Sequence, residues 1–511
     1  MPDVAIAAPN EASADAGERI AAAGGNAVDA ALAASLVTMV NEVGIVSLSS
    51  GGFITVQPPD GSAPQTVDGW IDMPGRSQQL GGGLLDGSAA DTAAASGGGT
   101  WDVDTAYGGG VTVTIGPGSV GAHGSIAAFG EAHRRWGSIP WRELVAPAIE
   151  VARGGFRLSA ASRYYLEYVH DDIFGWDESS RAAIHDDAGG ITTDLIVVPD
   201  LDSALEQIAR YGPAAIYTGD LGQLISDAIL TRGGIVGRDD LAAYAAVTRP
   251  SLVTQVGEWT LGTNPPPSVG GVCVAAMLRL LDGRPKGEWT HDDVRHLIEV
   301  QRAVLGHRLA VFDSADDLEA EAAAYLALID SDHLAVLESG STAHVSATDS
   351  EGGACSVTVS SGYSSGMIAD GTGIWLNNCL GEPELNAHGL HGLAPGTRLL
   401  SNMAPTVGHH TSGAALAIGS PGADRITTAI VQALAGFASG GMNLQMAINH
   451  PRVHVHRART PNEEIKVETD LTMYYGGVAA TLREPDGHMI AAADPRRDGA
   501  VRHYRSPDAV D

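Results

Sequence analysis

The chain has 511 residues, of which 44% are apolar, as expected for a globular protein with one large core or two ordinary domains. Its formal net charge of −31 argues against nucleic acid as a partner, because binding phosphates requires a basic surface. The sequence holds no uncharged apolar run of about 18 residues, so we expect no membrane span and no membrane partner.

The three cysteines, Cys273, Cys355 and Cys379, are too few and too scattered for a disulfide framework or a CxxC metal site. This usage is typical of a reducing compartment. The first residues also lack the basic and apolar regions of a secretory signal, and we therefore expect a cytoplasmic protein.

In chain order, residues 11–40 predict helices, with a cap at the Gly24-Gly25-Asn26 interruption. The longest apolar stretch, residues 27–46, predicts a buried helix followed by a strand. Residues 51–57 predict a turn into another strand. Residues 81–110 contain ten glycines in thirty positions, which predicts a flexible surface loop because so little apolar area can be buried there.

From residue 139 to about 340 the pattern is helical, and from Ala343 it changes to β-branched and alternating residues. The strands predicted there cover 345–348, 354–360, 373–377 and 415–418. A helix-rich first part therefore meets a strand-rich second part at 340–345.

One candidate nucleophile is Ser364, in the GxSxG match of residues 362–366. That motif requires a strand before the serine and a helix after it, and residues 367–373 form a glycine-broken loop instead. We interpret it as a chance match in a glycine-rich chain.

Histidines are the only candidate metal ligands with useful spacing. His409 and His410 are adjacent and would point to opposite faces of a strand. His454 and His456, near His450, could share a face, but no HExxH motif or acidic residue at ligand spacing supports them. We expect surface or hydrogen-bonding histidines, with no metal and no cofactor.

A third candidate nucleophile, Thr342, lies in Ser341–Ser346, a polar turn that enters a strand. Alone, such a threonine is usually structural. Several ordered segments change that interpretation, because together they resemble the gamma-glutamyltranspeptidase family of N-terminal-nucleophile hydrolases. The segments are Ala23–Ala31, Trp136–Ile149, Pro265–Gly271, Thr342–His344, Gly371–Asn378, Gly419–Gly422 and Asp494–Gly499.

The resemblance implies an α+β fold, a four-layered αββα sandwich. It also implies self-cleavage between Ser341 and Thr342 into a large chain, 1–341, and a small chain, 342–511. These two fragments would form an αβ heterodimer within one intertwined domain. Cleavage converts the nitrogen of Thr342 from an amide into an amine, which can serve as the base for its own hydroxyl.

By resemblance, Thr342 is the nucleophile and Ser360 hydrogen-bonds its new amine. The backbone N–H groups of Gly422 and Ala423 form the oxyanion hole. The family usually has a second glycine where this chain has Ala423. The added methyl group would narrow the pocket unless the φ angle there is positive.

The substrate-binding side departs further from the family. Trp70 stands where relatives that bind glutamyl groups have an arginine that holds a carboxylate, and an indole cannot replace it. Gly362 replaces an asparagine, and Cys379 follows Asn378 where the family usually has an acidic or amide residue. The family's paired serines become Ser401 and Asn402, and by resemblance we expect Asn378, Ser401 and Asn402 to bind the substrate. Glu382 matches the acidic residue that binds the substrate amine.

These changes predict a hydrolase or acyltransferase that cleaves an amide-type or carbon–carbon bond in a small molecule through an acyl-Thr342 intermediate. We expect an aromatic or apolar acyl group packed on Trp70, in an intracellular pathway such as antibiotic biosynthesis. One alternative is an ordinary γ-glutamyltransferase or glutathione hydrolase that uses Arg76. The other is an inactive binding protein on the same scaffold.

Overall fold

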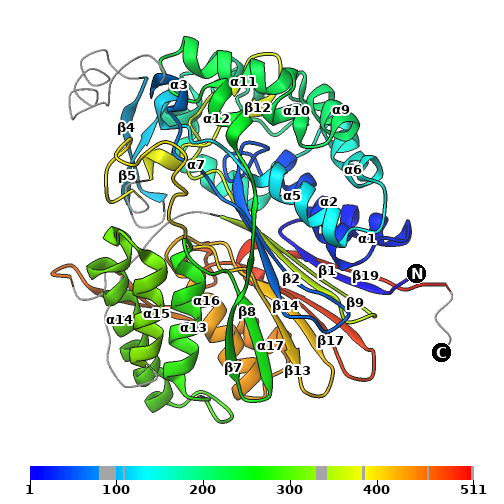
Figure 1. Cartoon of the computed structure of the whole chain (residues 1–511), viewed down its shortest axis with the longest axis vertical. Coiled ribbons are helices and arrows are strands. Elements are labelled where there is room, and N and C mark those ends of the chain that lie inside the picture. The colour runs from blue at the N-terminus through cyan, green and yellow to red at the C-terminus, as the bar shows by residue number, and fades with distance from the viewer. Residues whose placement is uncertain (80–98, 108–109, 330–341, 383–385, 457–459, 508–511) are drawn as a thin grey trace.

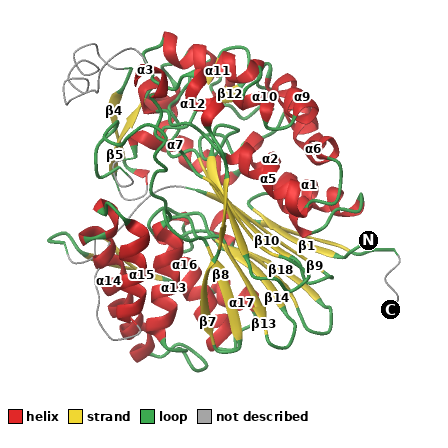
Figure 2. Cartoon of the chain, viewed as in Figure 1, coloured by secondary structure: helices red, strands yellow, loops and turns green. Residues whose placement is uncertain are grey.

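The computed structural model describes residues 1–79, 99–107, 110–329, 342–382, 386–456 and 460–507. In this part of the chain, two antiparallel sheets pack face to face, and helices cover both outer faces (Figures 1 and 2). The predicted α+β, four-layered αββα sandwich is confirmed.

The first sheet has seven strands in the described residues. In spatial order they are β19 (Ala500–Tyr504), β1 (Val4–Ala8), β9 (Ala343–Asp349), β10 (Ala354–Ser360), β2 (Gly51–Gln57), β3 (Gln65–Gly69) and β6 (Val247–Pro250). The second sheet runs β18 (Met489–Ala493), β17 (Ala479–Arg483), β14 (Ala415–Gly419), β13 (Thr406–His410), β8 (Trp259–Thr263) and β7 (Leu252–Val256). Both sheets therefore combine strands from before and after residue 342.

Three two-stranded ribbons lie outside these sheets. They are β4 (Trp101–Thr105) with β5 (Val111–Ile115), β11 (Ile368–Ala369) with β12 (Ile374–Trp375), and β15 (Val453–His456) with β16 (Glu464–Val467). The β4 strand falls inside the predicted 81–110 loop, so that prediction is wrong for residues 101–105. Residues 80–98 and 108–109 of the loop lie outside the described part of the chain.

Helices α1 (Glu11–Ala22), α2 (Ala27–Asn41) and α5 (Ser125–Trp136) cover the first sheet, and α13 (Val269–Leu281), α16 (Arg425–Leu434) and α17 (Leu444–Asn449) cover the second. The remaining helices are α3 (Arg76–Gln79), α6 (Trp141–Gly154), α7 (Ala160–Phe174), α8 (Glu178–Ile184), α9 (Leu201–Tyr211), α10 (Ala214–Tyr217), α11 (Asp220–Thr231), α12 (Arg238–Ala243), α14 (His291–Ala310) and α15 (Leu318–Ile329). Along the described residues, no helix combines the length and hydropathy needed to cross a bilayer.

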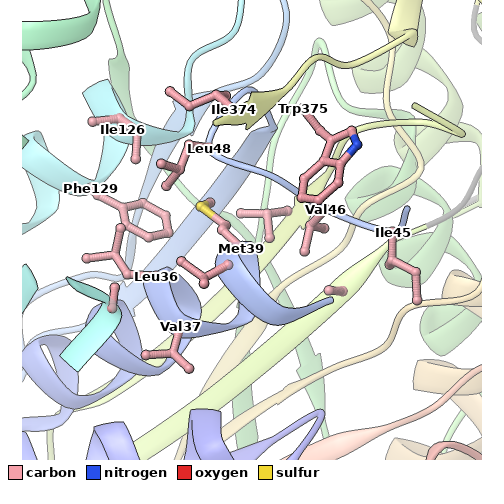
Figure 3. Packing of buried hydrophobic residues seen from close by; sticks show 14 of the residues in the cluster. Leu36, Val37, Met39, Ile45, Val46, Leu48, Ile126, Phe129, Ile374 and Trp375 are labelled. Atoms are coloured by element: carbon pink, nitrogen blue, oxygen red, sulfur yellow. The ribbon is translucent and has the colours of Figure 1, made fainter. Parts of the chain in front are cut away.

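Helix α2 shows how the sequence fixes the helical layer. Asn26 caps it, with its side chain accepting from the N–H groups of Val28 and Asp29 in a capping box. Every residue of α2 is buried, and its apolar side chains fill the space around Leu36 and Met39 (Figure 3). The strand predicted after this helix is wrong: residues 43–45 form a turn, in which Gly44 has a φ of 83°.

The helical pattern predicted for 139–340 is also wrong at its centre. Residues 247–263 form β6, β7 and β8, where β-branched residues cluster around a turn at Gly257. Strand β7 forms the edge of the second sheet, and the β7–β8 hairpin packs against α13.

Candidate active site

Strands β9 and β10 direct alternate side chains into the space between the two sheets. His344 bridges two neighbours there, with Nδ1 2.8 Å from Thr358 Oγ1 and Nε2 2.8 Å from Ser346 Oγ. Ser356 Oγ donates to the Ile418 carbonyl in the second sheet at 3.0 Å. The even-numbered residues therefore face the second sheet, and the odd-numbered ones pack under the helices.

Burial, which disfavours the charged form, lowers the pKa of His344 to about 3. The ring is therefore neutral at physiological pH and joins two strands through hydroxyl groups. It adds no charge beside Thr342, the residue expected to begin the small chain.

Thr342 directly precedes β9 and is 2% exposed. Ala343 pairs with Val359, so extending that register by one residue sets Thr342 opposite Ser360. Opposite residues of an antiparallel pair point to the same face, which directs both hydroxyl groups into the space between the sheets. Ser341, on the other side of the expected cut, lies outside the described residues.

Arg497 contacts the expected nucleophile from the other end of the chain. Its Nη1 donates to the Thr342 carbonyl at 3.4 Å, and the side chain is buried. The Asp494–Gly499 segment signalled family resemblance in the sequence, but gave no indication of this contact. Asp494 in turn accepts from Arg452 at 2.6 Å, which ties the segment to the second sheet's helical cover.

The expected oxyanion hole follows β14. Gly419, its last residue, lies against the His344 ring, since a Cβ there would be 2.3 Å from His344 Cε1. Ala423 has a φ of 66°, which meets the condition under which its methyl group is tolerated. Gly422 and Ala423 stand just before the N-terminus of α16, where the helix dipole adds positive potential for an oxyanion.

Asp424 connects this loop to a buried network. Its Oδ2 lies 2.9 Å from His454 Nε2 and 3.3 Å from His456 Nδ1, and its Oδ1 pairs with Arg425. Burial opposes ionisation, but Arg425 and His454 outweigh it and hold the pKa of Asp424 well below its usual range. His454 and His456 are hydrogen-bonding histidines, as expected, and the structure adds an acidic partner that their sequence spacing did not show. The partner lies 30 residues away from His454, a separation no local motif reveals.

Strand β2 separates Ser360, on β10, from Trp70, which directly follows β3. Gly51 pairs with Ser360, and a Cβ on Gly51 would be 2.6 Å from Trp70 Cε3, so the indole fills the place of a Gly51 side chain. Trp70 Nε1 donates to the Leu400 carbonyl at 2.7 Å, directly before Ser401. The indole is only 1% exposed, so it forms part of a packed wall.

Two arginines lie near the carboxylates that flank Trp70 in the sequence. Arg398 donates to Asp68 Oδ1 and Asp72 Oδ1, each at 2.6 Å, on either side of Trp70 in the sequence. Arg76 Nη2 lies against Gly396, and its charge acts on Asp72. The arginine clamp on Asp68 and Asp72 was not evident from the sequence, because Arg398 is remote along the chain.

The packing around Gly362 shows why this chain lacks the asparagine that the family usually has at this position. The φ of Gly362 is 67°, and a Cβ would be 2.4 Å from Asn378 Oδ1 and 3.0 Å from Glu382 Oε1. Asn378 Oδ1 also accepts from the Tyr363 N–H at 2.6 Å. The space that a side chain at 362 would use is therefore filled by Asn378 and Glu382, which the sequence analysis assigned to substrate binding.

The other expected binding residues lie nearby and are also buried. Ser401 Oγ accepts from the Met403 N–H at 3.2 Å, and the Ser401 carbonyl accepts from the Val269 N–H at the start of α13. Asn402 is 3% exposed. Burial, with a smaller effect from the charge of Glu382, raises the pKa of the Cys379 thiol well above its usual range.

Ser364 does not form a nucleophile elbow. Its Oγ donates to the Leu376 carbonyl at 3.2 Å, and the chain continues into β11 instead of a helix. The neighbouring Ser361 contacts the 47–50 loop, with its Oγ 2.7 Å from Ser50 Oγ.

The profile of the Gamma-glutamyltranspeptidase family matches residues 13–504. The chain is 26% identical to the glutathione hydrolase proenzyme of Escherichia coli (strain K12) over 96% of this chain and 90% of that protein. It is 27% identical to the acylase ACY 1 proenzyme of Pseudomonas sp. (strain V22), over 95% and 90% respectively. Its fold matches the crystal structure of cephalosporin acylase from Bacillus halodurans with a TM-score of 0.75 at 19% identity, covering 98% and 96% of the two chains. The chain therefore belongs to the gamma-glutamyltranspeptidase family and is an enzyme of the N-terminal-nucleophile hydrolase class.

Proposed function

We propose that this protein is an autoprocessing hydrolase or acyltransferase whose nucleophile is Thr342, released by cleavage after Ser341. The support is the position of Thr342, buried at the start of β9 with Ser360 opposite in the strand register. The relatives named above are both proenzymes, in keeping with this scheme. The two fragments would stay together as an αβ heterodimer because both sheets contain strands from each fragment.

In the proposed reaction, the freed amine of Thr342 takes the proton of its own hydroxyl. A reference pKa near 8 suits this role close to neutral pH. The hydroxyl oxygen attacks the substrate carbonyl, and the N–H groups of Gly422 and Ala423 stabilise the oxyanion. Collapse releases the leaving group and leaves an acyl-Thr342 ester, which water or an amine then resolves.

The acyl group that we propose is aromatic or apolar and not a γ-glutamyl group. Trp70 carries this proposal, because it fills the position next to Ser360 and Ser401 where a carboxylate-binding arginine stands in the family. Arg398 is committed to Asp68 and Asp72. Glu382 remains as an acidic group for a substrate amine, and one relative is itself named an acylase.

A pair of anilides tests this choice. Fully cleaved protein is assayed with phenylacetyl-p-nitroanilide and with γ-glutamyl-p-nitroanilide. We expect kcat/KM for the aromatic acyl group to be at least about 10-fold higher, which corresponds to about 1.4 kcal/mol of transition-state binding. A preference for the γ-glutamyl substrate would contradict the proposal.

The alternative is γ-glutamyl transfer with Arg76 as the carboxylate ligand. It is favoured by the retained Glu382 and by the relative named glutathione hydrolase. In that case Arg76→Ala would raise KM for the γ-glutamyl anilide, whereas Arg76→Lys would restore part of the affinity. Unchanged KM in both variants would exclude Arg76 from this role.

We also place the enzyme in an intracellular biosynthetic pathway, such as one for an antibiotic. The support is indirect: Cys273, Cys355 and Cys379 are unpaired and buried, as in proteins of reducing compartments. Carbon–carbon cleavage beside a carbonyl would use the same acyl-Thr342 intermediate.

A further inference from the structure

A cluster of two histidines and one carboxylate lies between α7 and the hairpin that follows α8, which carry none of the proposed catalytic residues. His170 and Asp171 belong to α7, and His185 follows α8 and pairs with Ile191. His170 Nδ1 lies 2.9 Å from His185 Nε2. Asp171 Oδ1 lies 3.9 Å from the first of these nitrogens and 3.8 Å from the second.

The three atoms are spaced as ligands of one ion would be. A triangle with sides of 2.9, 3.8 and 3.9 Å has a circumscribed radius of about 2.1 Å, which equals the usual length of zinc–nitrogen and zinc–oxygen bonds. A cation at that centre would lie at bonding distance from all three atoms. An ideal tetrahedral site separates its ligands by about 3.4 Å, so the two nitrogens need to open by only about half an ångström.

The orientation of His185 is already suited to a metal. Its Nδ1 lies 3.1 Å from the Arg181 carbonyl, which can only accept, so the proton is assigned to Nδ1. Nε2 then presents its lone pair toward His170 and Asp171. A metal-bound histidine commonly donates its other N–H to a backbone carbonyl in this way.

Exposure provides a route for the ion and room for a water ligand. The His185 side chain is 3% exposed, that of His170 is 25% exposed and that of Asp171 is 77% exposed. The net charge of −31 also attracts cations to the surface.

We propose that His170, Asp171 and His185 bind a divalent transition metal of the zinc type, with water as the fourth ligand. Two imidazoles and one carboxylate favour such ions over Mg²⁺ or Ca²⁺, which prefer oxygen ligands. The ion would cross-link α7 to the 185–191 hairpin. Helix α7 also carries Tyr165, whose hydroxyl donates to the Tyr363 carbonyl at 2.7 Å, next to Gly362. The metal would therefore stabilise the helix that supports this part of the active site.

A second group of this kind in the described residues, Asp424 with His454 and His456, is a weaker candidate. Its carboxylate is already paired with Arg425. A divalent cation there would lie beside a buried guanidinium, and the repulsion would be poorly screened.

The test uses the full-length protein after dialysis against a chelator. Zn²⁺ binding is measured by calorimetry, and Co²⁺ is titrated while visible absorption reports on its ligand field. We expect one equivalent of each ion to bind, and His170→Ala and His185→Ala each to weaken Zn²⁺ binding at least about 10-fold. His488→Ala is the matched control, because His488 pairs with Glu484 on the surface and belongs to no three-ligand group among the described residues.

Circular dichroism and melting temperature in chelator show whether the variants are folded. Zn²⁺ should raise the melting temperature of the wild-type protein and of His488→Ala, but not that of His170→Ala or His185→Ala. Binding that survives both substitutions would overturn the proposal. So would binding that is lost in His456→Ala, which would assign the ion to the Asp424 group. Because neither readout depends on turnover, an inactive enzyme would leave this result intact.

Discussion

The proposed nucleophile region and the proposed acyl-binding wall of this enzyme are built in different ways. The nucleophile region, Thr342, Ser360 and Gly422–Ala423, is positioned by backbone: a strand register and a loop before a helix N-terminus. The wall is made of buried side chains that fill one another's space, namely Trp70, Asn378, Glu382, Ser401 and Asn402. Backbone donors survive a substitution such as glycine to Ala423, whereas the single replacement of the family's arginine by Trp70 removes the expected carboxylate ligand. Such a scaffold can keep its reaction while its substrate changes.

The largest effect is expected in the nucleophile region. Thr342→Ala removes the hydroxyl that we propose for both self-cleavage after Ser341 and attack on the substrate. We therefore expect an uncut chain and a loss of turnover of at least about 10³-fold. Thr342→Ser, which keeps a hydroxyl and an amine, should still be cleaved. Mass spectrometry and an anilide assay measure both outcomes. Cleavage and turnover by the Thr342→Ala protein would show that Thr342 is not the nucleophile, and the proposed nucleophile region would be wrong.

Asp424 tests whether the oxyanion loop depends on side chains after all. Asp424→Ala leaves Arg425 buried without its carboxylate, and we expect a loss of about 3–5 kcal/mol in unfolding free energy. Asp424→Asn retains an acceptor for His454 and should lose less. Urea unfolding measures both variants. An alanine variant as stable as the wild type would show that the network does not hold this loop.

Gly362 tests the packing of the wall. Gly362→Asn restores the residue that the family usually has, but its Cβ would meet Asn378 Oδ1 at 2.4 Å. We expect a loss of about 1–3 kcal/mol from overpacking. Gly362→Ala is the matched control. It introduces the same Cβ, but asparagine tolerates a positive φ better than alanine does, so the two variants separate the effect of packing from that of backbone strain. If the asparagine variant is fully stable in urea unfolding, the wall is less tightly filled than described.

The smallest effect, per unit of pH, comes from two buried neutral histidines, His344 two residues after Thr342 and His123 beside Ser49. Burial lowers the pKa of His344 to about 3 and that of His123 to about 4. In the unfolded protein both histidines regain an ordinary pKa near 6.5, so below that pH the unfolded state binds more protons than the folded state. Stability should therefore fall by about 1.4 kcal/mol per pH unit for each histidine as the pH drops from 6.5 toward 4.

Urea unfolding at pH 7 and pH 5 measures this slope. His344→Gln and His123→Gln should each remove one share of it. An unchanged slope in both variants would mean that other groups cause the acid sensitivity.

Local sequence patterns predicted much of the fold. The Asn26 cap and the strand patterns of β9 and β10 depend on neighbouring residues, and the structure confirms them. Contacts between remote residues could not be read in this way. Arg497 reaches Thr342 across 155 positions, and Arg398 reaches Asp68 across 330. The β6–β8 strands were missed because their apolar residues are also compatible with the surrounding helical pattern.

The central claim is that Thr342 becomes the N-terminus of a separate fragment. Intact-mass analysis of purified wild-type protein, combined with N-terminal sequencing, measures this directly. We predict two fragments, residues 1–341 and 342–511, with the second beginning Thr-Ala-His. A single uncut chain, as expected of an inactive binding protein, or a second fragment beginning at any other residue would contradict the account.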